Sequence, residues 1–195
     1  MNILLDILGG TFIGGILLLL VIKLNIFTAN ASFYSDNELK LQQNAKTLAE
    51  IINYDLRKIG YNYDGVAIIT ADSTHIKFYA DMNEPGTPGY GTVDVVEYYL
   101  KDSTSSVGTS NPSDRVLCRI INYADTISGP SLGLVNLKFS YLNVQDIETT
   151  ILEDIVYVKA EFWVEPTEIV NNFITGQQDS SVFTYWELTI NPRNI

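Results

Sequence analysis

An uncharged apolar run near the N-terminal end constrains this chain more than any other feature. Sixteen consecutive residues, from Ile7 to Ile22, carry no charge, and the apolar character continues past Lys23 to Phe27. A transmembrane helix needs about 20 mostly apolar residues. The long stem of a lysine near the helix end can also carry its ammonium group to the membrane surface. The run therefore predicts a membrane-anchoring helix within residues 1–30.

A cleaved secretory signal peptide is the alternative explanation of the same run. Ala29-Asn30-Ala31 resembles the small-residue site at which such signals are cut. A signal peptide normally begins with Lys or Arg, whereas the residues before this run include Asp6 and neither Lys nor Arg. We therefore favour a retained anchor.

Within this helix, five residues are candidates for contacts between helices in an assembly: Asp6, Gly10, Phe12, Gly14 and Leu17. Gly10 and Gly14 form a GxxxG spacing, which lets helices approach closely in lipid. Asp6 has two interpretations. Its carboxylate faces water at the membrane surface, at the helix end where the dipole favours negative charge, or it pairs with a cation such as a neighbouring chain's N-terminal amine.

A second apolar pattern follows the anchor and predicts an amphipathic helix. Its members recur at steps of three and four residues, which places them on one helix face; they are Leu41, Ala45, Leu48, Ile52, Leu56 and Ile59. Gly60 follows the basic pair Arg57-Lys58, as is usual at a helix end. With no proline before Pro85, nothing interrupts a helix over about residues 2–59.

After Gly60 the pattern changes to that of strands, which are rich in Val, Ile and aromatic residues and are separated by turn residues. The predicted strands are Val66–Thr70, Thr74–Ala80, Val93–Lys101, Arg115–Tyr123, Val135–Leu142, Ile155–Val164 and Val182–Ile190. The expected fold is α+β, with a mostly antiparallel sheet packed on the C-terminal half of the helix. We expect a helical part over residues 1–60 and a β-rich head over 61–195. The helical part divides into a transmembrane and assembly segment (1–30) and an amphipathic segment (31–60).

Composition excludes several functional classes. With one Cys and one His, the chain lacks the ligands for a zinc site or an iron–sulfur cluster. Twelve Lys and Arg against 23 Asp and Glu give a net charge of −11, the wrong sign for a nucleic-acid partner. Alternation places His75 on the solvent side of a strand, and Cys118 reads as a small core residue. We therefore expect no enzyme and no cofactor.

One pair of acids is a candidate for a metal ion, although we expect none to be bound. Asp102 and Asp114 flank a loop rich in Ser and Thr, and their carboxylates together with loop carbonyls could hold Ca²⁺. The spacing of an EF-hand is absent.

Several segments resemble those of type IV pilin-like proteins, in particular PilW/GspJ-type minor pilins and pseudopilins. The helix end LKLQQNAKTLAEIINYDLRKIGY (Leu39–Tyr61) carries the most specific part of the resemblance. VVEYYL (Val95–Leu100), DRVLCRI (Asp114–Ile120) and LTINPRNI (Leu188–Ile195) carry the rest. The resemblance implies a pilin-like fold. It also implies that Asp6, fifth when counted from Asn2, takes the place of the acid that pairs with an adjacent subunit's amine.

The expected function is that of a structural subunit of a type IV pilus-like filament or pseudopilus. Its partners would be copies of itself or other pilin-like subunits, with residues 1–30 in the membrane before assembly. It would lie in the cell membrane as a single-pass protein, in an extracellular filament, or in both, with the head in the periplasm or outside the cell. Two alternatives remain: an accessory subunit of a membrane complex whose head binds one specific partner, and a lone anchored binding domain. The charge of −11 opposes dense packing of identical copies, which favours a minor or accessory subunit.

Overall fold

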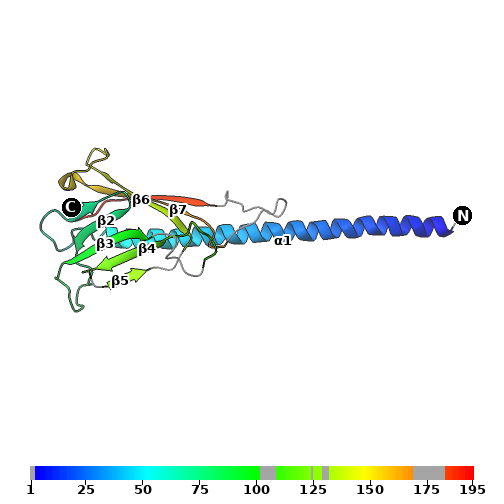
Figure 1. Cartoon of the computed structure of the whole chain (residues 1–195), viewed down its shortest axis with the longest axis horizontal. Helices are drawn as coiled ribbons and strands as arrows, with labels where there is room; N and C mark the ends of the chain where they lie inside the picture. Colours follow the sequence, from blue (N-terminus) through cyan, green and yellow to red (C-terminus); the bar gives the residue numbers. More distant parts are fainter. Residues whose placement is uncertain (1–2, 102–108, 124, 129–131, 169–182) are drawn as a thin grey trace. The chain divides into compact units, whose positions relative to one another are not determined.

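The computed structural model describes residues 3–101, 109–123, 125–128, 132–168 and 183–195. In these ranges one long helix precedes two antiparallel sheets, which confirms the predicted α+β class (Figure 1). The elements are α1 (Ile3–Leu56), β1 (Ile68–Ala71), β2 (His75–Ala80), β3 (Asp94–Lys101), β4 (Val116–Ile121), β5 (Asp125–Ser128), β6 (Leu134–Leu142), the short 3₁₀ helix η2 (Leu152–Asp154), β7 (Tyr157–Val164) and β8 (Thr184–Ile190).

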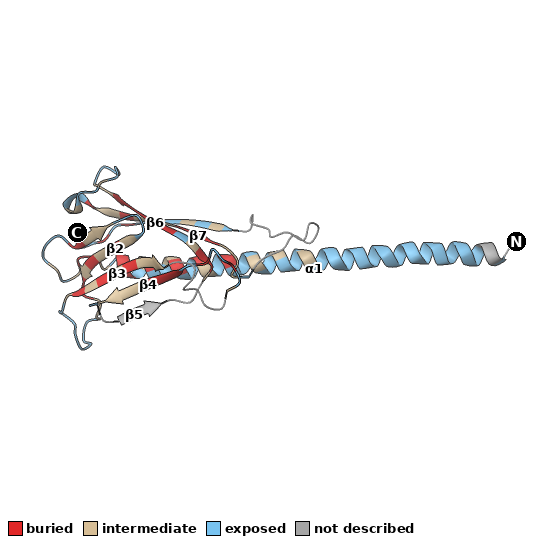
Figure 2. Ribbon diagram, in the orientation of Figure 1, coloured by how far each residue is buried: buried red, intermediate tan, exposed pale blue. Residues whose placement is uncertain are grey.

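The chain divides into two compact units, Met1–Lys40 and Leu41–Ile195. In the first unit, nearly every described residue of α1 is exposed (Figure 2). The second unit combines the last turns of α1 with the strands of both sheets. The predicted division at residues 30 and 60 separates segments by their expected roles, whereas these two units are defined by contacts between residues. The predicted division therefore stays a prediction.

The two sheets follow the chain order closely. One has the order β1-β2-β3-β4-β5 and the other β6-β7-β8, and among the described residues every pairing of neighbouring strands is antiparallel. The sequence predicted a single mostly antiparallel sheet, whereas the structure has two. They are joined at the turn between β1 and β2, where Phe139 N donates to Ser73 O (2.7 Å) and the Tyr141 hydroxyl donates to Asp72 O (2.9 Å).

The core of the second unit forms where α1 meets the inner faces of both sheets. The residues of the amphipathic stripe on α1 are buried there, none more than 3% exposed: Leu41, Ala45, Leu48, Ile52, Leu56 and Ile59. Phe78 and Tyr98 from the first sheet and Phe162 from the second belong to the same apolar cluster. The hydrophobic effect over this shared core therefore holds the end of the helix and both sheets together.

The helix ends at Leu56, three residues before the predicted end. Beyond it the backbone bonds tighten to steps of three, with Lys58 N donating to Asp55 O and Ile59 N to Leu56 O, as is common in a final turn. Gly60 follows with φ +77°, and a Cβ at this position would lie 2.3 Å from the backbone oxygen of Asn194. Only glycine fits both the left-handed conformation and this close approach of the C-terminal segment.

Each of the seven predicted strands overlaps an observed strand, but β5 was missed. Its sequence, Asp-Thr-Ile-Ser, is short and mostly polar, so it reads as part of a turn. It forms a strand because it pairs with β4, from Cys118↔Ser128 to Ile121↔Asp125. Tertiary pairing here overrides local propensity.

The neighbouring residues Ile51 and Ile52 test how far burial of the helix stripe stabilises the second unit. Ile51 is 42% exposed and Ile52 is 1% exposed. We expect Ile52→Ala to lower the free energy of unfolding by about 3 kcal/mol, because it leaves a cavity in the core. Ile51→Ala should lower it by about 0.5 kcal/mol or less. Denaturant unfolding of the full chain in detergent measures both values, and equal losses would contradict the packing described.

Candidate assembly site

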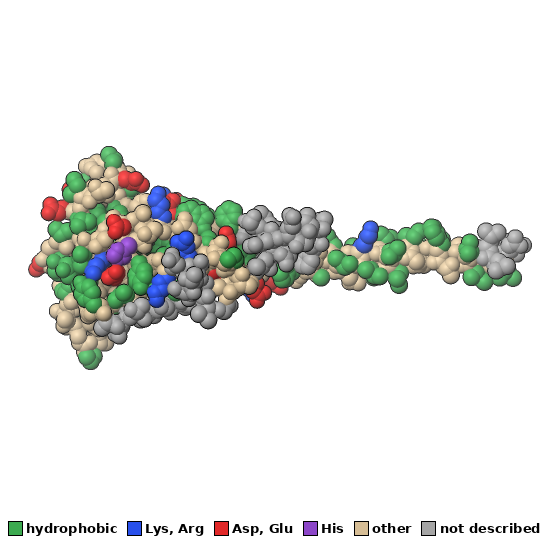
Figure 3. All heavy atoms as spheres, viewed as in Figure 1, with side chains coloured by type: hydrophobic (Ala, Val, Ile, Leu, Met, Phe, Trp, Pro, Cys, Tyr) green, Lys and Arg blue, Asp and Glu red, His purple; other side chains and the backbone are tan. Residues whose placement is uncertain are grey.

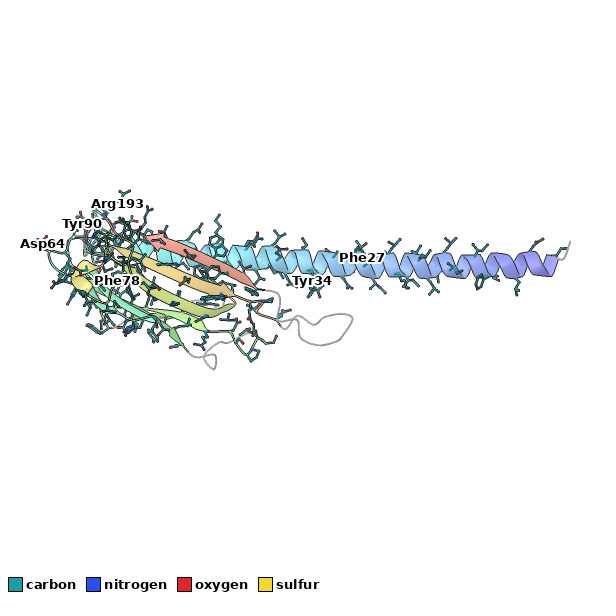
Figure 4. The ribbon with its side chains drawn as sticks, turned by 90° about the horizontal axis from the view of Figure 1, so that it is seen from above. Phe27, Tyr34, Asp64, Phe78, Tyr90 and Arg193 are labelled. Carbon is teal, nitrogen blue, oxygen red and sulfur yellow. The ribbon has the colours of Figure 1, made fainter. Side chains whose placement is uncertain are left out.

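The first unit presents a long apolar surface that no described residue of the chain covers. Phe12 is 70% exposed, Leu17 56% and Phe27 71%, and Figures 3 and 4 show such side chains along this segment. Within α1 an 18-residue window reaches a mean hydropathy of 2.3 with none of it buried. By length and composition, this helix can cross a membrane. A contiguous apolar surface of this kind marks a site for lipid or another protein.

Helical geometry sorts the candidate assembly residues into two groups. Asp6, Gly10, Gly14 and Leu17 follow one another at steps of four, four and three, so at 100° per residue they share one face. Phe12 lies on the other side of the helix by the same geometry. α1 continues through all four of its glycines without a break, and a Cβ added at Gly10 or Gly14 would meet nothing within 4 Å. The shared face is therefore flat and open.

Asp6 is exposed in the first turn of α1. Among the described residues no cation lies within ion-pair distance of its carboxylate. The position suits a carboxylate, because the positive end of the helix dipole lies there. Any pairing of Asp6 with a cation must therefore come from outside the described part of this chain.

In the second unit, a buried polar cluster fastens α1 to the first sheet. Asp55, on α1, is 3% exposed. Its carboxylate oxygen Oδ2 accepts a hydrogen bond from the Tyr98 hydroxyl on β3 and another from Arg119 Nε on β4, the latter at 2.5 Å. A buried charge is tolerated only when it is paired in this way. The cluster thus fixes how the helix end sits on β3 and β4.

The surroundings of this cluster shift two pKa values. Burial and the adjacent Asp55 carboxylate raise the pKa of Tyr98 far above its ordinary value, so the hydroxyl keeps its proton. Burial alone would lower the pKa of Arg119, but the Asp55 carboxylate outweighs it and the net pKa is raised. The raised pKa keeps the Arg119 guanidinium protonated beside the carboxylate that it contacts.

A second buried carboxylate shapes the segment between β2 and β3. Asp81 is fully buried and accepts hydrogen bonds from Asn62 Nδ2 (2.7 Å), Gly91 N (2.7 Å) and Asn83 N (3.1 Å). Burial by itself would raise the pKa of Asp81, whereas these hydrogen bonds stabilise the charged carboxylate and lower it. The hydrogen bonds have the larger effect, so the pKa lies below the ordinary 3.8. Asp81 therefore ties the turn after α1 to both ends of the 81–91 segment.

Four further residues were considered from the sequence as possible catalytic or metal-binding groups, and the structure describes three of them. His75 Nε2 lies 2.9 Å from Glu97 Oε1 across neighbouring strands, and the Cys118 thiol is buried in β4. Asp114 is buried, whereas Asp102 lies outside the described residues, so the structure does not test whether this pair could hold calcium, and the expectation that no metal is bound stays a prediction. Within the described ranges, no three His, Cys, Asp or Glu side chains gather as metal ligands.

Asp55, Tyr98, Arg119 and Asp81 were not assigned a role from the sequence. The first three lie inside the segments that carried the family resemblance. A charge inside an apolar strand or beside an apolar stripe was the available signal, as in the Leu-Cys-Arg-Ile of β4. Pairing the charges required the fold, because Asp55 and Arg119 are 64 residues apart.

Removing one partner of the buried cluster should be costly. Asp55→Ala leaves the Arg119 guanidinium without its carboxylate, and we expect the free energy of unfolding to fall by about 3 kcal/mol. Glu50→Ala is the matched control, because its pair with Lys46 is 3.7 Å long and both side chains are 68% exposed. That loss should be about 0.5 kcal/mol or less. Denaturant unfolding distinguishes the two, and a tolerated Asp55→Ala would refute the role of the cluster.

Asp81 should make part of the stability depend on acid. Because its pKa is lowered on folding, its contribution is complete above the unfolded value of 3.8 and is lost as the pH falls through the lower folded value. The difference in Tm between the unsubstituted chain and Asp81→Asn should therefore be constant from about pH 7 to 5 and shrink as the pH falls from about 4 to 2. A difference that stays constant to the lowest pH would contradict this assignment.

The comparisons with known proteins agree with this architecture. The type IV-like pilin TTHA1219 from Thermus thermophilus matches the structure with a TM-score of 0.50 and 9% sequence identity, over 79% of this chain and 97% of that one. The sequence matches no protein-family model and no curated protein. At 9% identity the likeness shows the fold alone. The chain therefore has a type IV pilin-like fold, as its resemblance to pilin-like sequences predicted.

Proposed function

We propose that this chain is a non-enzymatic structural subunit that assembles, through its apolar N-terminal helix, into a type IV pilus-like filament or pseudopilus. The observation that carries the proposal is the exposed apolar part of α1 in a chain with a pilin-like fold. Such a surface is stable in water only when something covers it. Lipid covers it before assembly, and the helices of neighbouring subunits cover it afterwards.

The face formed by Asp6, Gly10, Gly14 and Leu17 suits contacts between helices. Glycines without a nearby side chain let two backbones approach closely, and close approach is what stabilises helix pairs in lipid. A carboxylate costs about 2.5–3.5 kcal/mol at the centre of a membrane helix on insertion scales, and less near the surface. Pairing Asp6 with the N-terminal amine of a neighbouring subunit would remove much of this cost and set the stagger between helices.

The second unit supports a structural role. Among the described residues, the histidine is bonded to Glu97 and the cysteine is buried, which supports structural roles for both. We place the head in the periplasm or outside the cell, and the partners are copies of this chain or other pilin-like subunits. Unless the heads are spaced or screened, or opposite charges meet where they touch, the net charge of −11 favours a minor subunit, because densely packed identical heads would repel one another.

The substitution Asp6→Ala tests the proposal. We expect the amount of assembled protein to fall by about tenfold, because the pairing that sets the stagger is lost, while the second unit remains folded. Asp36→Ala, which removes an exposed acid further along the same helix, should assemble normally. The readouts are the sedimentable filament fraction and the near-ultraviolet circular dichroism of the aromatic residues.

Two outcomes would count against the proposal. Asp6→Ala that assembles as well as Asp36→Ala would remove the role of Asp6. Discrete particles with a single copy of the unsubstituted chain would favour the accessory-subunit alternative.

A further inference from the structure

A groove in the second unit combines apolar walls with basic side chains. It has a volume of about 400 Å³ and lies where α1 ends, between the 81–91 segment and the C-terminal residues. Tyr54, Tyr61 and Pro85 contribute apolar surface to it. Figure 4 shows Arg193 at the same end of the unit as Tyr90, whose hydroxyl lies 3.3 Å from that of Tyr61. We call this feature the basic groove.

The charge of the basic groove is opposite to that of the chain. Arg57, Lys58 and Arg193 line it beside a single acid, Glu84. Three of the 12 basic residues of a chain with net charge −11 therefore meet at one hollow. Lys58 is engaged with Met82 O (3.1 Å) and lies over the Tyr54 ring.

The two arginines are available for a further partner. Both Arg57 and Arg193 are exposed. In the part of the chain that the structure describes, neither has a carboxylate within ion-pair distance. Arginine binds carboxylates in a bidentate way. The basic groove thus suits an acidic segment that also carries apolar side chains.

The same chain presents a segment with this chemistry. Residues 143–154, between β6 and β7, contain Asp and Glu at four positions and no Lys or Arg. Its aliphatic side chains are unusually exposed: Val144 66%, Ile147 61% and Ile151 58%. We call it the acidic segment. It combines acidic and apolar groups, as an occupant of the basic groove should.

We propose that, in the assembly, the basic groove of one copy receives the acidic segment of a second copy. The inference deepens the proposed function and rests on it, because it requires copies of this chain to meet. Within one chain the end of the acidic segment lines a different hollow, with Leu152 and Glu153 beside Val66 and Ile195. The basic groove therefore remains open to another copy.

Such a contact would join two different surfaces of the same molecule. A contact of this kind is heterologous, and it propagates from copy to copy as a helix unless the rotation closes a ring. It would also bring opposite charges together where two heads meet, which offsets part of the repulsion expected between chains of charge −11. The chain would then specify its neighbour through the head as well as through α1.

Cross-linking between two differently tagged full-length chains tests the contact. One chain carries Asn194→Cys in the basic groove and the other Gln145→Cys in the acidic segment. Both are produced in the same cells and treated with a short bismaleimide in the membrane or filament fraction. A mixed product forms only when the groove of one chain meets the segment of another. Each substituted chain produced with a differently tagged partner that carries only the buried Cys118 gives the background.

Charge reversals then test the complementarity. Arg57→Glu with Arg193→Glu should lower the mixed product by about tenfold, and Glu153→Lys with Asp154→Lys should do the same. Combining the groove reversal on the Asn194→Cys chain with the segment reversal on the Gln145→Cys chain should restore most of it. Lys40→Glu with Lys46→Glu makes the same charge change at two exposed positions that line neither the basic groove nor the hollows beside the acidic segment, and it should have little effect. Circular dichroism confirms that each variant is folded.

Several outcomes would overturn the inference. No mixed product from normally assembled protein would refute the contact and leave the proposed function intact. A product that is indifferent to the groove reversal, or that the combined reversals fail to restore, would also refute it. A mixed product that depends on charge in preparations without filaments would support the contact and contradict the filament proposal.

Discussion

The need to cover an apolar helix governs this structure. α1 carries apolar side chains over most of its length, and water does not tolerate a continuous surface of that size. From Leu41 onward the stripe on α1 is buried in the apolar core that both sheets share. In the part of the chain that the structure describes, nearly all residues before Lys40 are exposed. One helix thus stabilises a folded unit at one end and requires a membrane or an assembly at the other.

Polar groups determine how the covered part of the helix is held. An apolar stripe alone allows a helix to slide or rotate on a sheet, because hydrophobic contacts are non-directional. The Asp55 carboxylate, bonded to Tyr98 and Arg119, admits one arrangement of α1 against β3 and β4. Asp81 acts similarly on the segment that lines the basic groove. These buried carboxylates stabilise specific geometry, because moving any partner leaves a charge unpaired away from water.

The regular features of the fold were predictable from local pattern. The stripe from Leu41 to Ile59 and the alternation in β2 and β3 reflect periods of 3.6 and 2 residues, which any burial on one side imposes. Local pattern did not predict three other features: the end of α1, the strand β5 and the division into two sheets. Each of them depends on a partner that is distant in sequence. The same applies to the buried cluster, whose hydrogen bonds join residues that are 43 and 64 positions apart in the sequence.

The candidate binding features depend on the fold or on other chains. Tyr54, Glu84 and Arg193 line one groove only in the folded chain. The role of Asp6 and the glycines still rests on the pattern, because the partners that we propose for them belong to other chains.

Electron cryomicroscopy of the protein, taken from the native membrane or from a sheared surface fraction of cells that produce it, tests the central claim most directly. The account predicts filaments in which the N-terminal parts of α1 from neighbouring subunits pack into one shared apolar core, with Asp6 beside an amine of the adjacent chain. A discrete particle with a single copy, its helix surrounded only by lipid, would contradict that account. The pilin-like fold would then serve an anchored binding or accessory protein.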